Sequence, residues 1–182
     1  MRAFVAVDIE AARPTVRLLD AVRETRARVR VVDPENLHIT LKFLGETDDG
    51  LVPFIREALV GAIEGEDPFT LTLHGSGAFP NPRNPRVIWI GVQGGEPLVR
   101  IAKRLERALQ ELGFERERRR FTPHLTVGRV KSRKDVEGLT ELLAIHRDEA
   151  FGTQRVEELR LKRSELRPTG AVYHDVIRVP LG

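Results

Sequence analysis

The tripeptide pattern His-x-Thr occurs twice in this chain of 182 residues, each time within a segment that suits a β-strand. Residues 36–44 alternate between polar and apolar side chains, the apolar set being Leu37, Ile39, Leu41 and Phe43. Because side chains two apart in a strand share a face, His38 and Thr40 project together, opposite that set. The second copy, His124 and Thr126, alternates in the same way with Leu125 and Val127. The repeat therefore predicts two equivalent strands, each anchored by an apolar face.

The other hydrophobic patterns predict helices interspersed among further strands. The expected strands are residues 2–9, 36–44, 69–73, 87–92, 121–130, 153–163 and 171–179. The expected helices are residues 14–29, 50–64, 96–112 and 134–146, with Pro14 in the first turn of the first helix. Residues 77–86 are rich in Pro and Asn and predict a turn that makes a hairpin of the strands around it.

This order of elements predicts an α+β fold, since antiparallel strand pairs dominate and no regular βαβ alternation is visible. We expect two similar lobes, each an antiparallel sheet with helices, and one His-x-Thr strand in each lobe. A central cleft between the lobes would receive the His and Thr side chains. Residues 1–182 are predicted to form a single domain of this bilobal kind.

The amino-acid composition excludes several kinds of functional site. The chain has no cysteine, which excludes disulfides, thiolate metal sites and cysteine nucleophiles. No stretch approaches the roughly 20 apolar residues that cross a bilayer, and the start of the chain lacks the features of a signal peptide. We therefore expect a cytoplasmic protein that does not enter membranes. The net charge of +3 comes mostly from arginine, which permits RNA as a partner without establishing it.

Two imidazoles and two hydroxyls facing one cleft would suit acid–base chemistry at phosphorus. One histidine can take a proton from water while the other gives one to a leaving oxygen, and Thr40 and Thr126 can hydrogen-bond phosphate oxygens. Arg129 lies five residues after His124, so on a regular strand it would point away from the cleft. A bend at Gly128, or a position at the tip of the strand, would return it to the cleft, where it could bind phosphate charge.

Each of these residues also has a structural interpretation. A single His/Thr pair is most often the polar face of a sheet, and Arg129 is equally well a solvated charge. Two copies in matched contexts favour a functional site. His74, His146 and His174 lack such a context and are interpreted as structural or surface residues. A histidine-ligated metal site is weakly supported, because short His spacing and paired carboxylates are missing.

The motif segments resemble those of the 2H phosphoesterase superfamily, and most closely its branch of 2′-5′ RNA ligase-like RNA 2′,3′-cyclic phosphodiesterases. The resemblance is carried by residues 36–45 (NLHITLKFLG) and 121–129 (FTPHLTVGR). The opening residues 2–7 and the late segment 161–173 also resemble that branch, so the likeness spans nearly the whole chain.

This resemblance implies metal-independent hydrolysis of a terminal RNA 2′,3′-cyclic phosphate to a 2′-phosphate, without a cofactor. It implies that His38 is the general acid, that His124 is the general base, and that Thr40, Thr126 and Arg129 bind the phosphate. The partner would be RNA with a cyclic phosphate end, tRNA fragments included, and the protein would be a monomer. The reverse joining of RNA ends through a 2′-5′ bond is also associated with the family.

Three alternatives stay open at the level of sequence. The same fold could act on another cyclic nucleotide or on a 2′-5′ oligonucleotide, since specificity would lie in loops such as 77–86 and 115–120. A non-catalytic RNA-binding module is the third alternative. Such modules usually display aromatic side chains on a sheet, whereas only 5% of the residues here are aromatic.

Overall fold

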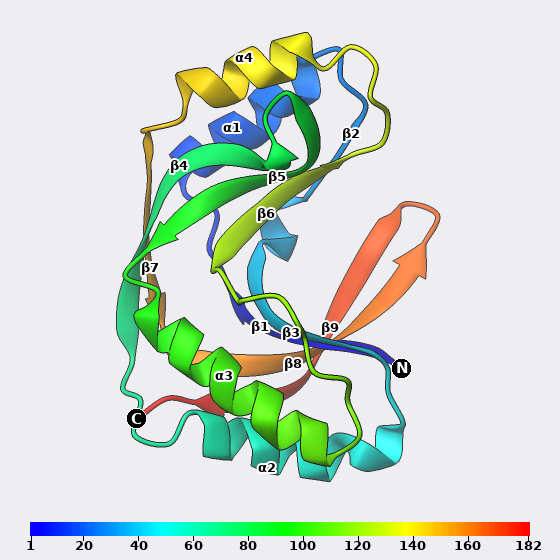
Figure 1. Ribbon diagram of the computed structural model, residues 1–182, viewed down its shortest axis with the longest axis vertical. Helices are drawn as coiled ribbons and strands as arrows, with labels where there is room; N and C mark the ends of the chain where they lie inside the picture. Colours follow the sequence, from blue (N-terminus) through cyan, green and yellow to red (C-terminus); the bar gives the residue numbers. More distant parts are fainter.

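The computed structural model describes all residues, 1–182, and contains two antiparallel sheets and four α-helices (Figure 1). The first sheet has the strand order β3-β1-β8-β9 and comprises β1 (Arg2–Asp8), β3 (His38–Glu46), β8 (Glu158–Arg167) and β9 (Gly170–Pro180). The second has the order β2-β6-β5-β4-β7 and comprises β2 (Val29–Val31), β4 (Phe69–Asn81), β5 (Asn84–Gln93), β6 (His124–Val130) and β7 (Ala150–Val156). The predicted α+β class is therefore confirmed.

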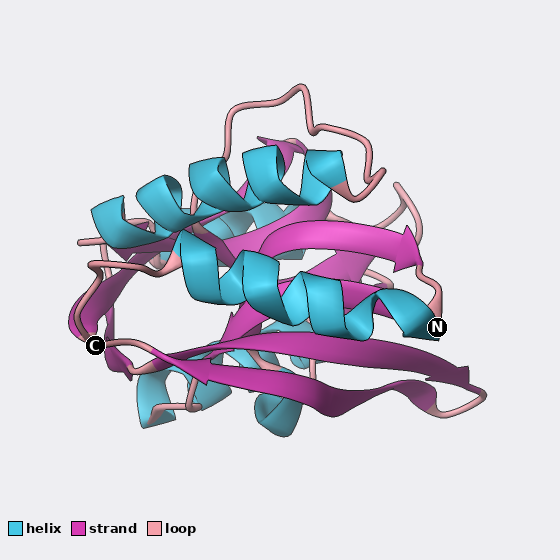
Figure 2. Cartoon of the chain, turned by 90° about the horizontal axis from the view of Figure 1, so that it is seen from below, coloured by secondary structure: helices cyan, strands magenta, loops and turns pink.

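Each sheet is covered by two helices on the side away from the other sheet, which gives two lobes (Figures 1 and 2). Helices α2 (Val52–Ala62) and α3 (Glu96–Glu111) pack on the first sheet, and α1 (Arg13–Glu24) and α4 (Glu137–Ile145) pack on the second. Short 3₁₀ helices at Pro34–Asn36 and Asp49–Leu51 precede β3 and α2. None of the helices is long and apolar enough to cross a membrane.

The hydrophobic core extends through both lobes. Helix α3 shows how the sequence builds it, because Leu98, Ile101, Leu105 and Leu109 recur at helical spacing and all four side chains are fully buried. One cluster of 35 buried residues contains side chains from both sheets, including Val5 of β1 and Ile90 of β5. The two lobes therefore share one continuous apolar interior.

The chain passes repeatedly between the lobes. After β1 it enters the second lobe for α1 and β2, and it returns for β3 and α2. It then crosses again for the hairpin β4–β5, for α3, for the segment from β6 to β7, and finally for β8 and β9. As a result neither lobe is a contiguous stretch of sequence, although each contains one of the two predicted motif strands.

Three sequence-based boundaries were wrong. The first helix ends at Glu24 rather than near residue 29, because its apolar stripe stops at Val22 and the next stripe positions are polar; Val29 instead begins β2. The expected turn at 77–86 is mostly strand, and only residues 82 and 83 connect β4 to β5. The expected strand 153–163 is two strands, β7 and β8, which belong to different sheets and are separated at Glu157.

The predicted alternation of β3 fails at its far end. A register shift leaves Leu41 without a partner on β1, so that Val5 pairs with Lys42 and Ala6 with Thr40. Such a bulge moves the following side chains to the opposite face. Phe43, expected beside Leu37 and Ile39 in the core, is instead 65% exposed, and Lys42 is buried against Glu106 of α3.

Candidate active site

The first motif lies on β3 as predicted. Leu37 and Ile39 are buried, while His38 and Thr40 are only partly buried and project from the opposite face. On the neighbouring strand, Asp8 is the direct cross-strand partner of His38. Directly opposed residues of an antiparallel pair lie on the same face, so the Asp8 carboxylate belongs to the surface that presents His38.

The second motif lies on β6 in the other lobe, between β2 and β5. Leu125 and Val127 are fully buried, and His124 and Thr126 are partly buried on the other face. Strands β3 and β6 lie close together where the two sheets meet. The predicted equivalence of the two motif strands is thus found in their burial pattern.

The two imidazoles are held by the same hydrogen bond. Nδ1 of His38 lies 2.7 Å from the backbone oxygen of Asn36, and Nδ1 of His124 lies 2.9 Å from the backbone oxygen of Thr122. A carbonyl oxygen can only accept, so Nδ1 must carry the proton in both rings. The Nε2 atom of each neutral ring therefore has a free lone pair, the form required of a base, and gains a proton to become an acid.

Aromatic side chains fix the orientation of both rings. The His38 ring lies 5.0 Å from the Phe4 ring and meets the Tyr173 ring edge to face at 5.2 Å. The His124 ring meets Phe79 edge to face, also at 5.2 Å between centroids. Such contacts restrict ring rotation and keep Nε2 aimed away from the backbone that holds Nδ1.

The surroundings of His38 lower its pKa. Burial is the largest cause, because it disfavours the imidazolium, and the charges of Lys162 and Arg129 act in the same direction. The hydrogen bond to Asn36 and the carboxylate of Asp8 oppose this shift and do not cancel it. His38 is therefore largely neutral around physiological pH.

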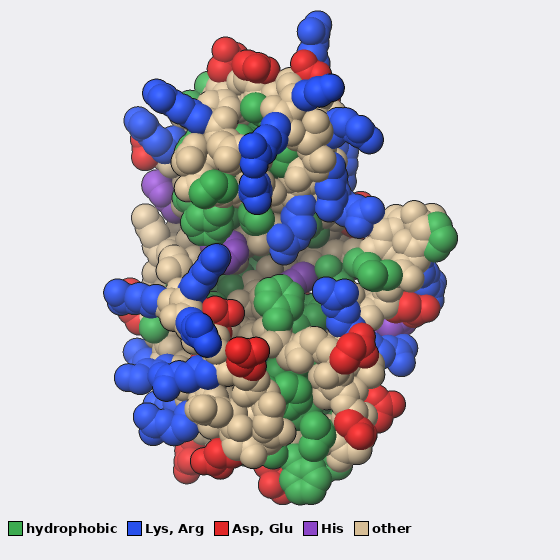
Figure 3. All heavy atoms as spheres, turned by 45° about the vertical axis from the view of Figure 1, so that its right-hand side comes forward, with side chains coloured by type: hydrophobic (Ala, Val, Ile, Leu, Met, Phe, Trp, Pro, Cys, Tyr) green, Lys and Arg blue, Asp and Glu red, His purple; other side chains and the backbone are tan.

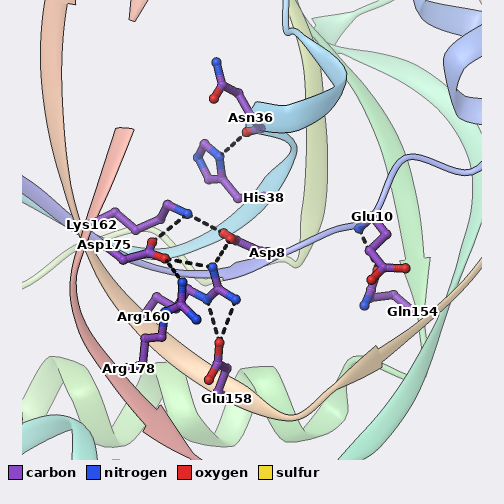
Figure 4. Close-up of polar contacts among 10 residues, drawn as sticks. All are labelled: Asp8, Glu10, Asn36, His38, Gln154, Glu158, Arg160, Lys162, Asp175 and Arg178. Atoms are coloured by element: carbon purple, nitrogen blue, oxygen red, sulfur yellow. Dashed lines mark hydrogen bonds and ion pairs between the residues drawn. The ribbon is translucent and has the colours of Figure 1, made fainter. Parts of the chain in front are cut away.

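An ionic cluster lies directly beneath His38 (Figure 4). Nζ of Lys162 lies 2.6 Å from one oxygen of Asp8 and 3.1 Å from Asp175, and Arg160 lies 2.6 Å from the other Asp8 oxygen. Burial alone would raise the pKa of Asp175, but the charges and hydrogen bonds of Lys162, Arg160 and Arg178 together hold it below its usual value. The ion pairs therefore hold the charges of Lys162 and Asp8 at fixed positions beneath the His38 ring.

Arg129 occupies the cleft face despite its odd spacing from His124. On β5, Gly91, Trp89 and Val87 alternate on one face and are paired with His124, Thr126 and Arg129 respectively. Val127 has no partner in this register, so a bulge at Val127 and Gly128 restores Arg129 to the side of the histidine. This agrees with the predicted bend at Gly128. The effect of Arg129 on the pKa of His38 links the second motif strand to the first.

The contacts of Phe4, Asp8, Tyr173, Lys162 and Phe79 with the site were not predicted from the sequence. The alternation of β1 does place Phe4 and Asp8 on one face, and this was the available signal, but nothing local indicates that β1 lies beside β3. His146 and His174 pair with surface carboxylates, in agreement with their structural interpretation. No group of three or more His, Asp or Glu side chains is arranged to hold a metal ion.

The face that carries the motifs is hollowed between the lobes, with histidine side chains visible in the hollow and basic side chains above them (Figure 3). A groove of about 510 Å³ lies on the first lobe, between the end of β3 and the loop after α3. The exposed ring of Phe43 and loop residues 114–119 line it. Of the two segments expected to be specificity loops, 115–120 is a loop and borders a groove large enough for a nucleotide. The other segment, 77–86, is largely strand.

Comparisons with known proteins identify relatives over nearly the whole chain. Residues 6–167 match the family model of the 2′-5′ RNA ligase superfamily. The chain is 41% identical to a protein of Methanothermobacter thermautotrophicus named RNA 2′,3′-cyclic phosphodiesterase, over 97% of this chain and 96% of that relative. A protein of the same name from Archaeoglobus fulgidus is 42% identical, over 97% and 98% of the two chains.

A solved structure agrees with this assignment. The TT0787 protein of Thermus thermophilus superposes on the chain with a TM-score of 0.81 at 31% identity, and the match covers 100% of this chain and 98% of that protein. Agreement of the family model, the relatives and the fold leaves one assignment. The chain belongs to the 2′-5′ RNA ligase superfamily.

Proposed function

We propose that this protein is an RNA 2′,3′-cyclic phosphodiesterase, which opens the cyclic phosphate at an RNA 3′ end to leave a 2′-phosphate. The observation that carries the proposal is the matched pair of imidazoles, each with Nδ1 on a backbone carbonyl and Nε2 free. The names of the relatives from M. thermautotrophicus and A. fulgidus support the same activity.

In this mechanism the two histidines act from opposite sides of the phosphorus. His124 Nε2 removes a proton from water as the water attacks phosphorus, and His38, protonated at Nε2, gives its proton to the departing 3′ oxygen. The bond from phosphorus to the 3′ oxygen breaks and a bond to the water oxygen forms. The cycle ends with His124 protonated and His38 neutral, and exchange with solvent restores the starting state. Burial of His38 lowers its pKa and so makes its imidazolium a stronger acid than an exposed one.

The phosphate is bound by groups from both motif strands. The hydroxyls of Thr40 and Thr126 donate hydrogen bonds to the two non-bridging oxygens, and the Arg129 guanidinium balances the charge that develops on them. All three residues lie on the same faces as the histidines. This arrangement uses protein groups alone, so we expect neither a metal ion nor a cofactor to be required.

The proposal also covers the substrate, the location and the oligomeric state of the protein in the cell. RNA with cyclic phosphate ends, tRNA fragments among them, is the proposed substrate, and the proposed form is a cytoplasmic monomer of one domain. If the 5′-hydroxyl of a second RNA attacked the cyclic phosphate in place of water, the same acid–base pair would form a bond from phosphorus to the 5′ oxygen, break the bond to the 3′ oxygen and leave a 2′-5′ linkage.

The direct test is hydrolysis of a short RNA that ends in a 2′,3′-cyclic phosphate, with a chelator present. We expect full activity in chelator and a 2′-phosphate product, identified by chromatography against 2′- and 3′-phosphate standards. His38→Ala and His124→Ala should each lower kcat by about 100- to 10,000-fold. His146→Ala, a change of the same kind on the surface, should leave kcat unchanged.

Two outcomes would contradict the proposal. One is survival of most of the activity in either motif variant while both variants remain folded. The other is a requirement for added metal after chelation. A 3′-phosphate product would instead show that the protein is a cyclic phosphodiesterase but that the proposed leaving group, the 3′ oxygen, is wrong.

A further inference from the structure

Two arginines face each other on the cleft side of the second sheet. Arg30 of β2 and Arg129 of β6 are direct cross-strand partners, so their side chains share a face, and it is the face of His124 and Thr126. Both are exposed, and neither forms an ion pair or a side-chain hydrogen bond. The edge strand β2 therefore adds a second guanidinium beside the one assigned to the phosphate.

The next residues along the two strands repeat the arrangement. The Lys131 backbone N–H donates to the Arg28 carbonyl at 2.8 Å, which continues the β2–β6 ladder by one pair beyond Val29 and Val130. Strand alternation returns Arg28 and Lys131 to the face of Arg30 and Arg129. They too are exposed and lack acidic partners. The two cationic pairs are separated by two strand residues, roughly 7 Å.

Directly opposed like charges destabilise a sheet, and none of these four cations has an ion pair that would offset this repulsion. By contrast, the cations beneath His38 and those beside Glu66 in the other lobe are paired with carboxylates. Figure 3 shows basic side chains on both lobes, several of them on the lobe above the histidines. An anionic ligand with two or more charges spaced along a line would reduce the repulsion within both cationic pairs.

Arg129, Arg30, Arg28 and Lys131 together form a basic strip, which begins at the proposed reaction centre. Arg129 lies close enough to His38 for its charge to lower the pKa of that group, and Arg30 lies one strand further out. Arg28 and Lys131 then lie further along the same strands. A cyclic phosphate held between the histidines is the 3′ end of an RNA chain, so the rest of that chain must leave the site in one direction. The strip supplies cations along such an exit.

We propose that Arg30, with Arg28 and Lys131, binds the backbone phosphates that precede the cyclic end, Arg30 taking the phosphate on the 5′ oxygen of the terminal nucleotide. The inference rests on the proposed cyclic phosphodiesterase activity. It makes RNA chains, rather than lone nucleoside cyclic phosphates, the substrate class. Arg30 is a specificity residue in this scheme and takes no part in the chemical step.

The test uses three substrates that differ by defined phosphates: adenosine 2′,3′-cyclic phosphate, its 5′-phosphorylated form, and a tetranucleotide ending in the same cyclic group. For the wild type we expect KM to fall with each added phosphate while kcat changes little, since remote contacts contribute uniform binding. Arg30→Gln should raise KM about tenfold for the two substrates that carry the 5′-phosphate. It should leave the unphosphorylated nucleoside unaffected.

Arg17→Gln is the matched control. Arg17 lies on α1, is exposed and has no ion pair, and it belongs to the same lobe on the helix-covered side. Both variants lose one positive charge, so the general electrostatic attraction of RNA changes equally. Arg30→Gln should also flatten the salt dependence of log(1/KM) for the tetranucleotide by about 0.7, the value for one phosphate contact on a single strand, whereas Arg17→Gln should not.

The inference would be overturned if Arg30→Gln behaved like Arg17→Gln on the tetranucleotide. It would equally be overturned if Arg30→Gln impaired all three substrates by one factor, because that result would place Arg30 at the cyclic phosphate itself. Failure of the proposed function is a separate result, namely no hydrolysis of any cyclic substrate by the wild type. In that case, anisotropy with a labelled tetranucleotide would still compare the binding of the two variants.

Discussion

The proton on His38 is controlled by a small number of named side chains. Burial, Lys162 and Arg129 lower the pKa of His38, whereas Asp8 and the carbonyl of Asn36 raise it. If His38 is the general acid, only the protonated fraction of the free enzyme is active. The value of kcat/KM should therefore fall as pH rises through the pKa of His38, and this fall should begin below the usual value of 6.5.

Lys162→Gln tests this directly. The change removes a positive charge near His38 and keeps a hydrogen-bond donor for Asp8, so the pKa of His38 rises and the falling limb of kcat/KM moves to higher pH. A nuclear magnetic resonance titration of the His38 ring reports the same shift without reference to rate. Lys103→Gln, an exposed unpaired lysine on α3, is the control and should move neither curve.

If instead the rising limb moved with the titration of His38, the acid and base roles would have to be exchanged between the two motifs. The sequence could not decide this point, because the two tripeptides are alike and the repeat is symmetric. The asymmetry comes from residues far away in the chain, Lys162 and Asp8 above all, which are brought beneath one histidine and not the other.

At the scale of elements, two β-bulges decide which side chains reach the cleft. The bulge at Leu41 exposes Phe43 beside the groove and buries Lys42, and the bulge at Val127 returns Arg129 to the histidine face. Strand alternation alone predicted the four His and Thr positions correctly, because they precede both bulges. It failed after each bulge, since an inserted residue reverses the parity of every later position.

Gly128 allows the bulge on β6 to lie against β2. A Cβ at this position would come within 2.8 Å of the Val29 side chain and 3.3 Å of the Arg30 carbonyl. We expect Gly128→Ala to lower the free energy of unfolding by about 1–3 kcal/mol, because β2 must move aside. It should also impair tetranucleotide turnover by displacing Arg30 and Arg129.

Gly138→Ala provides the comparison, measured by the same denaturant titration. Gly138 lies within α4 and its added Cβ would contact nothing within 4 Å. Alanine there should raise the free energy of unfolding by about 0.5–1 kcal/mol through helix propensity. Equal effects of the two substitutions would show that the β2–β6 contact is not as tight as described.

On the scale of the whole molecule, the lobes are interleaved in sequence and joined by one apolar core. We therefore expect the proposed single domain to unfold in one cooperative step. The chain has one Trp and one Tyr, and Trp89 lies in the second sheet while Tyr173 lies in the first. Fluorine labels on these two rings would each report one lobe.

Coincident denaturation midpoints at the two labels are the expected result. Midpoints that differ beyond experimental error would instead divide the protein into two domains. The sequence predicted two lobes and the class of fold, because each motif strand carries its own pattern. It could not predict how the strands are shared between the lobes, since β7 and β8 are adjacent in the chain and yet belong to different sheets.

The interleaving has a consequence for how the protein is made. Strand β1 is synthesised first and lies inside its sheet, between β3 and β8, and β8 begins only at Glu158. A ribosome must therefore translate the whole stretch from Asp8 to Glu158 before β1 can obtain its second neighbour. Until then β1 is an apolar strand whose backbone groups are unpaired along one edge. Such an edge is a binding site for chaperones or for neighbouring copies. Lys162, which lies beneath His38, belongs to the same strand β8, so a nascent chain that has not yet reached β8 has no complete reaction centre.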